Sequence, residues 1–238
     1  MEFFDLMNIS HRYMDILNPS TSEKIIKLGK LLKLKKGNRV IDFGCGCAEP
    51  LILWAEEFGI TGIGIDISED FCDRARKKLA VRGLSDQIEI VCSPAADYVF
   101  EEGAFDAATC IGATFVFGGY QQTIQAMKRA VHQNGRLGIG ETHWLSNQVH
   151  PEYAQKQATT HTEPELTQFL QHSDVSYVVC GGFGGKLDPA ATYRSPSSIW
   201  FQSGQFGFAD VSISGNETTL KFRDPDSNVV QSFTIIKH

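Results

Sequence analysis

Short apolar runs alternate with helical segments along the first part of the chain, and this alternation limits the folds that the chain can adopt. Five such runs occur, at residues 39–43, 62–66, 88–91, 105–110 and 135–140. Each run is too short for a buried helix, and helical patterns separate them, as at 69–82 and 120–132. Because parallel strands need crossover connections, usually helices, the pattern predicts an α/β fold with a doubly wound, mostly parallel sheet.

The two ends of the chain differ from this alternating part in their residue patterns. Residues 3–34 have helical periodicity that breaks at Asn18-Pro19, so we predict N-terminal helices. After about residue 165, glycine, serine and aromatic residues become more frequent, and four runs alternate apolar and polar residues: 198–208, 209–214, 218–222 and 229–236. Turn residues separate the later runs, which is typical of an antiparallel β meander. We therefore divide the chain into residues 1–165, a core with an N-terminal helical lid, and residues 166–238, a β-rich segment that completes or flanks the sheet.

Composition excludes several classes of protein. The 22 basic residues are outnumbered by 28 acidic ones, giving a net charge of −6, which disfavours a nonspecific nucleic-acid binder. No apolar run is long enough to span a bilayer, and the acidic start, Met1–Asp5, is unlike a signal peptide. None of the six cysteines forms a C-x-x-C pair. We expect a reduced, cytoplasmic protein that acts on a small molecule and has no membrane or nucleic-acid partner; the oligomeric state stays open.

Three features meet at the carboxyl ends of the first predicted strands, where open α/β sheets bind ligands. The first strand ends in Asp42-Phe43-Gly44-Cys45-Gly46, whose glycines let the backbone turn sharply and approach a ligand. Asp66 closes the second strand, 24 positions after Asp42, and a carboxylate there can accept both hydroxyls of a ribose. The loop after the third strand contains Pro94 and Ala95, where an adenine would lie. Together these features predict a cofactor that contains a nucleoside, bound by a Rossmann-like sheet.

Position 49 favours one cofactor over another. A dinucleotide fingerprint would have glycine or alanine there, beside a pyrophosphate at the helix N-terminus. This chain has Glu49, whose negative charge would repel a pyrophosphate. S-adenosylmethionine (SAM) has no phosphate and carries a sulfonium cation, so the sequence favours SAM over NAD.

Residues 20 to about 165 resemble small bacterial class I methyltransferases of the ubiquinone-biosynthesis type. The matching segments are residues 40–46 with Glu49, 64–68, 110–114 and 140–144. The resemblance implies the following site: Gly44, Cys45 and Gly46 beside the methionine moiety of SAM, Asp42 oriented toward its amine, Asp66 on the ribose, Ile67 against the adenine, and the backbone near Cys110 on the amine.

The chain departs from that family at two positions in the predicted site. Ala48 replaces a common third glycine, and Pro94 replaces an aspartate that accepts from the adenine amino group. Adenine recognition would then fall to Ala95, Ala96 or Asp97, so weaker binding of SAM is expected. A SAM- or nucleoside-binding module without turnover is therefore the alternative to an active methyltransferase.

Methyl transfer from a sulfonium is an in-line displacement in which the protein aligns the reactants and excludes water. Such chemistry requires no fixed motif, but polar residues at the strand ends are candidates for a base. Glu141 and His143 follow the fifth strand, and we predict them as the catalytic residues. The alternatives are a structural carboxylate for Glu141 and an exposed loop histidine for His143. His11 and Tyr13 are candidates for the lid, with core packing as the alternative.

The last part of the chain resembles the end of calcineurin-like metallophosphatases, from His172 to Gly181 and over the final thirty residues. In those enzymes the strand leads to a Gly-His-x-His sequence that ligates metals, whereas this chain has Gly182-Phe183-Gly184. Glycine cannot replace an imidazole ligand. We therefore predict that residues 166–238 bind no catalytic metal, and that residues 175–180 and the final hairpin supply the sixth and seventh strands of the sheet.

Overall fold

The computed structural model describes residues 3–18, 20–144, 160–162, 165–166, 168–169, 208–214, 217–223 and 229–236. The chain divides into two compact units, Met1–Phe169 and Leu170–His238. None of the described helices is long and apolar enough to cross a lipid bilayer.

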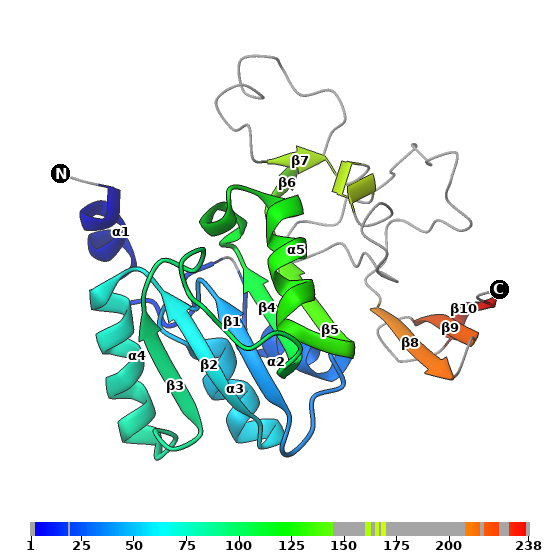
Figure 1. The fold of residues 1–238 in the computed structure, drawn as a ribbon, viewed down its shortest axis with the longest axis horizontal. Helices are drawn as coiled ribbons and strands as arrows, with labels where there is room; N and C mark the ends of the chain where they lie inside the picture. The colour runs from blue at the N-terminus through cyan, green and yellow to red at the C-terminus, as the bar shows by residue number, and fades with distance from the viewer. Residues whose placement is uncertain are drawn as a thin grey trace. The chain divides into compact units, whose positions relative to one another are not determined.

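The first unit is built on a five-stranded sheet in the order β3-β2-β1-β4-β5, with every neighbouring pair parallel (Figure 1). Its strands are β1 Arg39–Phe43, β2 Thr61–Asp66, β3 Ile88–Cys92, β4 Phe105–Ile111 and β5 Val131–Gly140. The order runs outward from β1 in both directions, so the chain winds first toward β3 and then toward β5. The predicted doubly wound, Rossmann-like sheet is confirmed.

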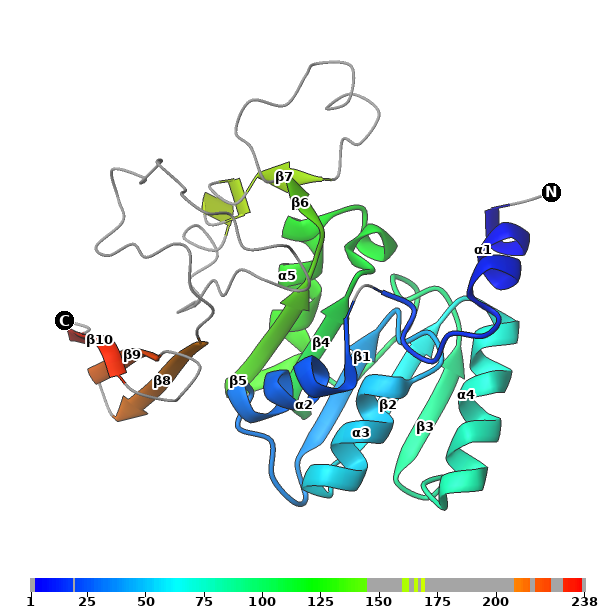
Figure 2. The same cartoon turned by 180° about the vertical axis from the view of Figure 1, so that it is seen from behind.

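Helices cover both faces of this sheet, as Figures 1 and 2 show from opposite sides. The helices of the first unit are α1 Phe3–His11, α2 Ser22–Leu31, α3 Glu49–Phe58, α4 Glu69–Arg82, the short 3-10 helix η1 Thr114–Phe117, and α5 Tyr120–Ala130. Helices α2, α3 and α4 contribute to one hydrophobic core, and α5 contributes to the other. The sheet therefore lies between two apolar layers.

Strand β1 shows why the chain forms a sheet with two buried faces. Val40 belongs to the core under α2, α3 and α4, whereas Ile41 and Phe43 belong to the core under α5. Successive strand side chains point to opposite faces, so a strand with apolar side chains on both faces must be covered on both sides. All three side chains are 0% exposed, and burial of each stabilises the fold by about 1.5–3 kcal/mol.

Helix α4 has the bounds that the sequence predicts, because both of its ends carry explicit signals. The Ser68 hydroxyl accepts from the backbone N–H of Phe71 and caps the N-terminus. Gly83 ends the helix in the left-handed conformation, at φ +68°. The side chain of Thr21 likewise caps α2, by accepting from the backbone N–H of Lys24.

The described strands of the second unit form an antiparallel meander in the order β10-β9-β8, as predicted. They are β8 Phe208–Ser214, β9 Glu217–Arg223 and β10 Val229–Ile236. These three strands hydrogen-bond to one another, because adjacent strands joined by short turns pair readily. The predicted place of the final hairpin as the sixth and seventh strands of the parallel sheet stays a prediction. Residues 172–184 and 198–207 lie outside the described residues, and the predicted flanking role of residues 166–238 stays a prediction.

Two short strands follow β5 that the sequence analysis does not anticipate. β6 His143–Trp144 and β7 His161–Thr162 pair in parallel as a separate two-stranded sheet. The indole N–H of Trp144 donates to the backbone oxygen of Thr160 at 2.9 Å and closes the pair. Two-residue strands leave no recognisable period in the sequence.

Candidate cofactor site and active site

A cavity of ≈ 280 Å³ lies at the carboxyl ends of β1, β2 and β4. Its walls come from the loop after β1, the end of β2, the loops after β3 and β4, and the segment before α2. This is the point where the strand order reverses, and there the loops after β1 and β4 leave in opposite directions and open a crevice. The sequence analysis predicted a ligand at this edge of the sheet.

The loop after β1 is held tightly between its neighbours. Gly44 and Gly46 have φ of +71° and +55°, in the left-handed region that favours glycine. The backbone N–H groups of Gly44 and Cys45 both donate to the carbonyl of Ile65, at 2.8 and 3.0 Å. A Cβ on Gly44 would overlap the Cβ of Ala113 in the loop after β4. The glycines therefore let two loops meet beside the cavity, which is the role that the sequence predicts for them.

Asp66, at the end of β2, is fixed by backbone donors and lines the cavity. Its Oδ2 accepts from the N–H of Gly46 at 2.8 Å, and its Oδ1 accepts from the N–H of Ser68 at 2.9 Å. Burial raises the pKa of Asp66, while these backbone hydrogen bonds lower it. A carboxylate has about four lone-pair sites, so both oxygens retain capacity for the two hydroxyls of a ribose.

Asp42 is the second carboxylate on the cavity, and it is only 2% exposed. The hydroxyl of Thr109 on β4 donates to its Oδ1 at 2.7 Å. Burial, opposed by the Thr109 hydrogen bond and assisted by the nearby charge of Asp66, raises the pKa of Asp42 to about 7. A cationic ligand would stabilise the ionised form, and the ammonium group of SAM is such a cation. The two aspartates and the glycine loop therefore fit the predicted cofactor.

The remaining predicted residues lie on the cavity with one exception. Ile67, 48% exposed, exposed Pro94 and buried Ala95 all line it, where the sequence analysis expects an adenine. Cys110 does not line it: its side chain is fully buried in the core under α5. The wall after β4 begins one residue later, at Ile111, because the side chain of Cys110 points to the α5 face of the sheet.

Glu49 does not play the part that the sequence argument gave it. Its carboxylate is buried and forms an ion pair with Lys78 of α4, and Glu49 is absent from the cavity wall. Because Lys78 neutralises the charge, the repulsion of a pyrophosphate is not a valid reason for preferring SAM over NAD. The partner lies 29 residues along the chain, on another helix, so the sequence pattern gave no sign of it.

Glu141 lies directly after β5, in a partly buried position. Burial raises its pKa, and a hydrogen bond with the Thr114 side chain lowers it. Its Oε2 is buried without a hydrogen-bond partner among the described residues. The phenol of Tyr120 is close enough that Glu141, together with burial, raises the Tyr120 pKa to about 12. Glu141 does not line the cofactor cavity as the structure has it.

His143 lies two residues beyond Glu141, in β6, where its backbone pairs with His161 of β7. Its side chain is partly buried, and it does not line the cavity. Both candidate catalytic residues thus follow the carboxyl end of β5, and their role stays a prediction. The structure does not bring them into the wall of the cofactor cavity.

The N-terminal segment contributes wall residues that the sequence analysis missed. Asp15, Leu17 and Asn18 line the cavity, whereas the predicted lid residues His11 and Tyr13 do not. Tyr13 is 86% exposed. The only sequence signal was the helix break at Asn18-Pro19, which indicates a turn but not what the turn covers.

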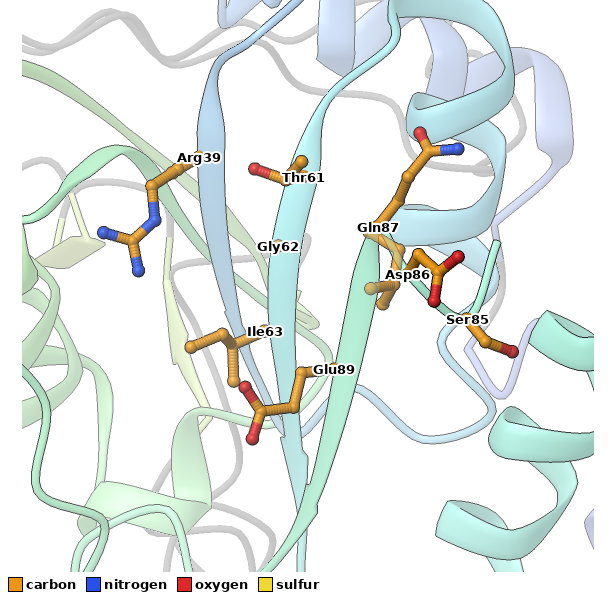
Figure 3. A pocket seen from close by; sticks show the side chains of 9 residues that line it. Arg39, Thr61, Gly62, Ile63, Ser85, Asp86, Gln87 and Glu89 are labelled. Atoms are coloured by element: carbon orange, nitrogen blue, oxygen red, sulfur yellow. The ribbon is translucent and has the colours of Figure 1, made fainter. Parts of the chain in front are cut away.

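A second cavity, of ≈ 220 Å³, lies at the opposite edge of the sheet. Figure 3 shows Arg39 of β1 and Glu89 of β3 on either side of β2. The guanidinium of Arg39 lies 5.0 Å from the ring centroid of Phe105. None of the predicted site residues lines this second cavity. Those that line a cavity are all at the carboxyl edge of the sheet.

Comparisons with known proteins agree with this site. Residues 40–135 match the family described as a methyltransferase domain. An uncharacterised protein of Escherichia coli K12, YjhP, is 35% identical over 167 residues, covering 70% of this chain and 67% of the relative. The crystal structure of a SAM-dependent methyltransferase from Thiobacillus denitrificans, in complex with S-adenosyl-L-homocysteine, matches with 31% identity and a TM-score of 0.65, covering 73% of this chain and 71% of that one. A demethylmenaquinone methyltransferase of Listeria monocytogenes is 30% identical over 115 residues, and the chain covers only 48% of its length.

Proposed function

The chain belongs to the class I methyltransferases that use SAM, and from this premise we propose that it transfers the methyl group of SAM to a small-molecule acceptor. The observation that carries the proposal is the pair of oriented carboxylates, Asp42 and Asp66, beside the glycine loop at the switch point of the sheet. The match to YjhP and to the Thiobacillus enzyme covers about 70% of the chain, so it extends well beyond the cofactor loop.

When bound, SAM supplies an electrophilic methyl group on a sulfonium. The residues of this chain hold and orient it. Asp66 would accept hydrogen bonds from the ribose hydroxyls, Asp42 would pair with the ammonium group, and Gly44 to Gly46 would let the backbone approach the methionine moiety. Ile67, Pro94 and Ala95 form an apolar surface for the adenine. The N-terminal segment and the loop after β4 exclude water from the reacting atoms.

Glu141 is the residue that we propose as the base, with His143 as a second candidate. A carboxylate with a raised pKa, and with a buried oxygen that has no hydrogen-bond partner in the described part of the chain, is suited to accept a proton from an acceptor molecule. The hydrogen bond with Thr114 gives the carboxylate one orientation. His143 lies on a backbone-paired strand two residues away, and its imidazole is a group that can accept a proton.

The acceptor is proposed only as a small molecule. The Listeria relative is named for demethylmenaquinone, but this chain covers less than half of its length. The alternative proposal is a module that binds SAM without turnover, and Pro94 on the cavity wall favours it, since no carboxylate stands there for the adenine amino group. We keep the cytoplasm as the proposed location, because Cys45, Cys47, Cys72, Cys92 and Cys110 are free thiols.

One pair of measurements tests the proposal. Titration of the purified full chain with S-adenosylhomocysteine (SAH) by calorimetry should show binding at one site. A screen that follows conversion of SAM to SAH over a panel of phenols, quinols, amines and sterols should then find an acceptor. Binding without turnover on any acceptor supports the non-catalytic alternative, and no binding of SAM or SAH contradicts both.

A variant then tests the proposed base. Glu141→Gln keeps the size of the side chain and removes the proton acceptor, so it should lower kcat by about 10²–10⁴-fold while SAH affinity is retained. Glu102→Gln is the matched control, because that exposed carboxylate pairs with Arg129 on the surface. Equal kcat in the two variants would show that Glu141 is only structural.

A further inference from the structure

Residues 11–18 run from the last residue of α1 toward α2, beside the cofactor cavity; we call this segment the strap. Four of its residues, Asp15, Ile16, Leu17 and Asn18, line the cavity together with the glycine loop and the loop after β4. Apart from Met7 of α1, the other residues of the cavity wall begin at Asp42, 24 positions after the end of the strap. A ligand in the cavity is therefore bounded by a piece of chain that could leave without disturbing the sheet.

Side chains of α4 hold the first half of the strap. The guanidinium of Arg74 donates to two strap carbonyls, to His11 from Nη1 at 3.2 Å and to Met14 from Nη2 at 2.5 Å. The Lys78 ammonium, one turn further along α4, pairs with the Asp15 carboxylate at 3.0 Å. Hydrogen bonds from a charged donor are stronger than those between neutral groups, so these two residues are effective anchors.

The second half of the strap rests on the walls of the cavity. The side-chain amide of Asn18 donates to the carbonyl of Ile111 after β4 at 3.3 Å. Leu17 lies over the glycine loop, so closely that a Cβ on Gly46 would be 2.7 Å from its Cδ1. The strap thus contacts both loops that border the predicted methionine position.

Lys78 also connects the strap to the helix that follows the glycine loop. The same ammonium group pairs with Glu49, the first residue of α3, whose carboxylate is buried. By contrast, the outer surface of the strap is open to solvent. Tyr13 is 86% exposed and Met14 is 40% exposed, and the side chain of Asp15 is 71% exposed. A segment with few buried contacts opens at low cost unless specific groups hold it.

We propose that Arg74 is a positioning residue that closes the strap over bound SAM, with the Asp15–Lys78 pair as a second anchor, so that these contacts set how long the cofactor stays bound. The inference rests on the proposed function, because it takes the ligand of this cavity to be SAM. Arg74 acts through the strap backbone and contacts no reacting atom. Its guanidinium also lies 5.8 Å from the ring of Phe71, which lines the cavity, so the anchor and the wall are adjacent.

The test compares two arginines on the same helix. Arg74→Met keeps the apolar stem and removes the donors to the strap. Arg82→Met is the control, because Arg82 also makes two hydrogen bonds from α4, but to Glu56 of α3. We expect Arg74→Met to raise the Kd for SAH about tenfold, mainly through faster dissociation, and Arg82→Met to leave it unchanged. Arg74→Lys, which retains one donor group, should recover part of the affinity.

Hydrogen exchange gives a readout that does not depend on turnover. SAH should slow exchange of the strap amides in the wild-type protein and in Arg82→Met, but much less in Arg74→Met. In steady-state kinetics with a working acceptor, Arg74→Met should raise KM for SAM with little change in kcat, since a uniform loss of cofactor binding has that signature. Asp15→Asn should show the same pattern with a smaller change, because that ion pair is exposed.

The outcomes separate this inference from the proposed function. If the wild-type protein does not bind SAH, the proposed function fails. If the wild-type protein binds SAH and Arg74→Met binds it with the same Kd and the same strap protection, the proposed function stands and the strap inference is overturned. Lys78 is not used as the first variant, because its loss would leave the buried Glu49 unpaired and would destabilise the fold.

Discussion

At the scale of single residues, Asp66 is the most direct test of the cofactor site. It accepts one backbone N–H on each oxygen and faces the cavity. Asp66→Ala should weaken SAH binding by about 1.5–3 kcal/mol, the contribution of hydrogen bonds to a charged group. Calorimetry measures the loss, and Asp86→Ala, at the opposite edge of the sheet, is the control. Unchanged affinity in Asp66→Ala would contradict the assignment of the ribose position.

Asp42 makes cofactor binding depend on pH. Its pKa in the free protein is raised to about 7 by burial, so below that pH the carboxyl is mostly protonated. The ammonium group of the ligand favours the ionised form and lowers this pKa, so binding releases a proton. Affinity for SAH should therefore rise as the pH increases toward 7, and level off above it until the amino group of the ligand itself loses its proton.

The check on Asp42 is calorimetry at several pH values in buffers of different ionisation enthalpy, which counts the protons released. Asp42→Asn still accepts from Thr109, and it should flatten the pH dependence. The stability of the free protein changes in the opposite direction: because the pKa is raised from an unfolded value of 3.8, Asp42 destabilises the free protein as the pH rises through about 4–7. A slope that persists in Asp42→Asn would assign the proton to another group.

Pro94 tests the adenine end of the cavity. It is exposed and lines the cavity beside Ile67 and Ala95. Pro94→Asp supplies a carboxylate at the position where the resembled family has one, so SAM binding should become tighter. Titration with SAM measures the change, and circular dichroism shows whether the fold is retained. Weaker binding by a folded variant would mean that the loop follows another path around the adenine.

At the scale of elements, two glycine variants can separate the free-energy cost of the contact between the loops after β1 and β4 from the cost of a left-handed backbone. Gly44 and Gly83 have nearly the same backbone conformation, with φ of +71° and +68°. A Cβ on Gly44 would overlap Ala113, whereas a Cβ on Gly83 would have no heavy atom within 4 Å among the described residues. Gly83→Ala should therefore lower the free energy of unfolding only by the cost of a left-handed alanine, about 1–2 kcal/mol.

Gly44→Ala should lower the free energy of unfolding by the same amount plus about 1–3 kcal/mol for the overlap with Ala113. It should also weaken SAH binding. Denaturant unfolding of both variants, with SAH titration of each, measures the two terms. Equal losses of stability would show that the loops after β1 and β4 can separate without cost, and would remove the close contact from the description of the site.

At the scale of the whole molecule, the first unit should fold without the second. The buried residues of its two cores lie between Ile25 and Ala130, and the partly buried ones that pack on them lie between Ile16 and Ile139. A chain ending at Phe169 should therefore be soluble, bind SAH with the affinity of the full chain, and unfold within about 4 °C of it, a difference of roughly 1 kcal/mol. Aggregation of the shortened chain would show that the β meander protects the first unit, as the predicted flanking role requires.

The sequence by itself determined the sheet and the position of the site. An apolar run such as 39–43 forms a strand that is buried on both faces, and the glycine after it allows a tight turn. Together they place a carboxylate at the end of the strand. These are properties of neighbouring residues, so Asp42, Gly44 and Asp66 could be predicted, and so could the bounds of α4, whose caps lie beside it.

Only the tertiary structure decided which distant groups meet. Lys78 cancels the charge of Glu49 across 29 residues, and Arg74 holds carbonyls more than 55 residues earlier in the chain. Strand β9 pairs with both β8 and β10 in a sheet of three antiparallel strands. Such contacts depend on how helices and strands pack, and the free energy of an ion pair or a strand pair depends on separation in space. The sequence specifies how far apart residues are along the chain. Packing determines how far apart they are in space, and these distances decide which charges are neutralised, what holds the strap closed and which strands pair.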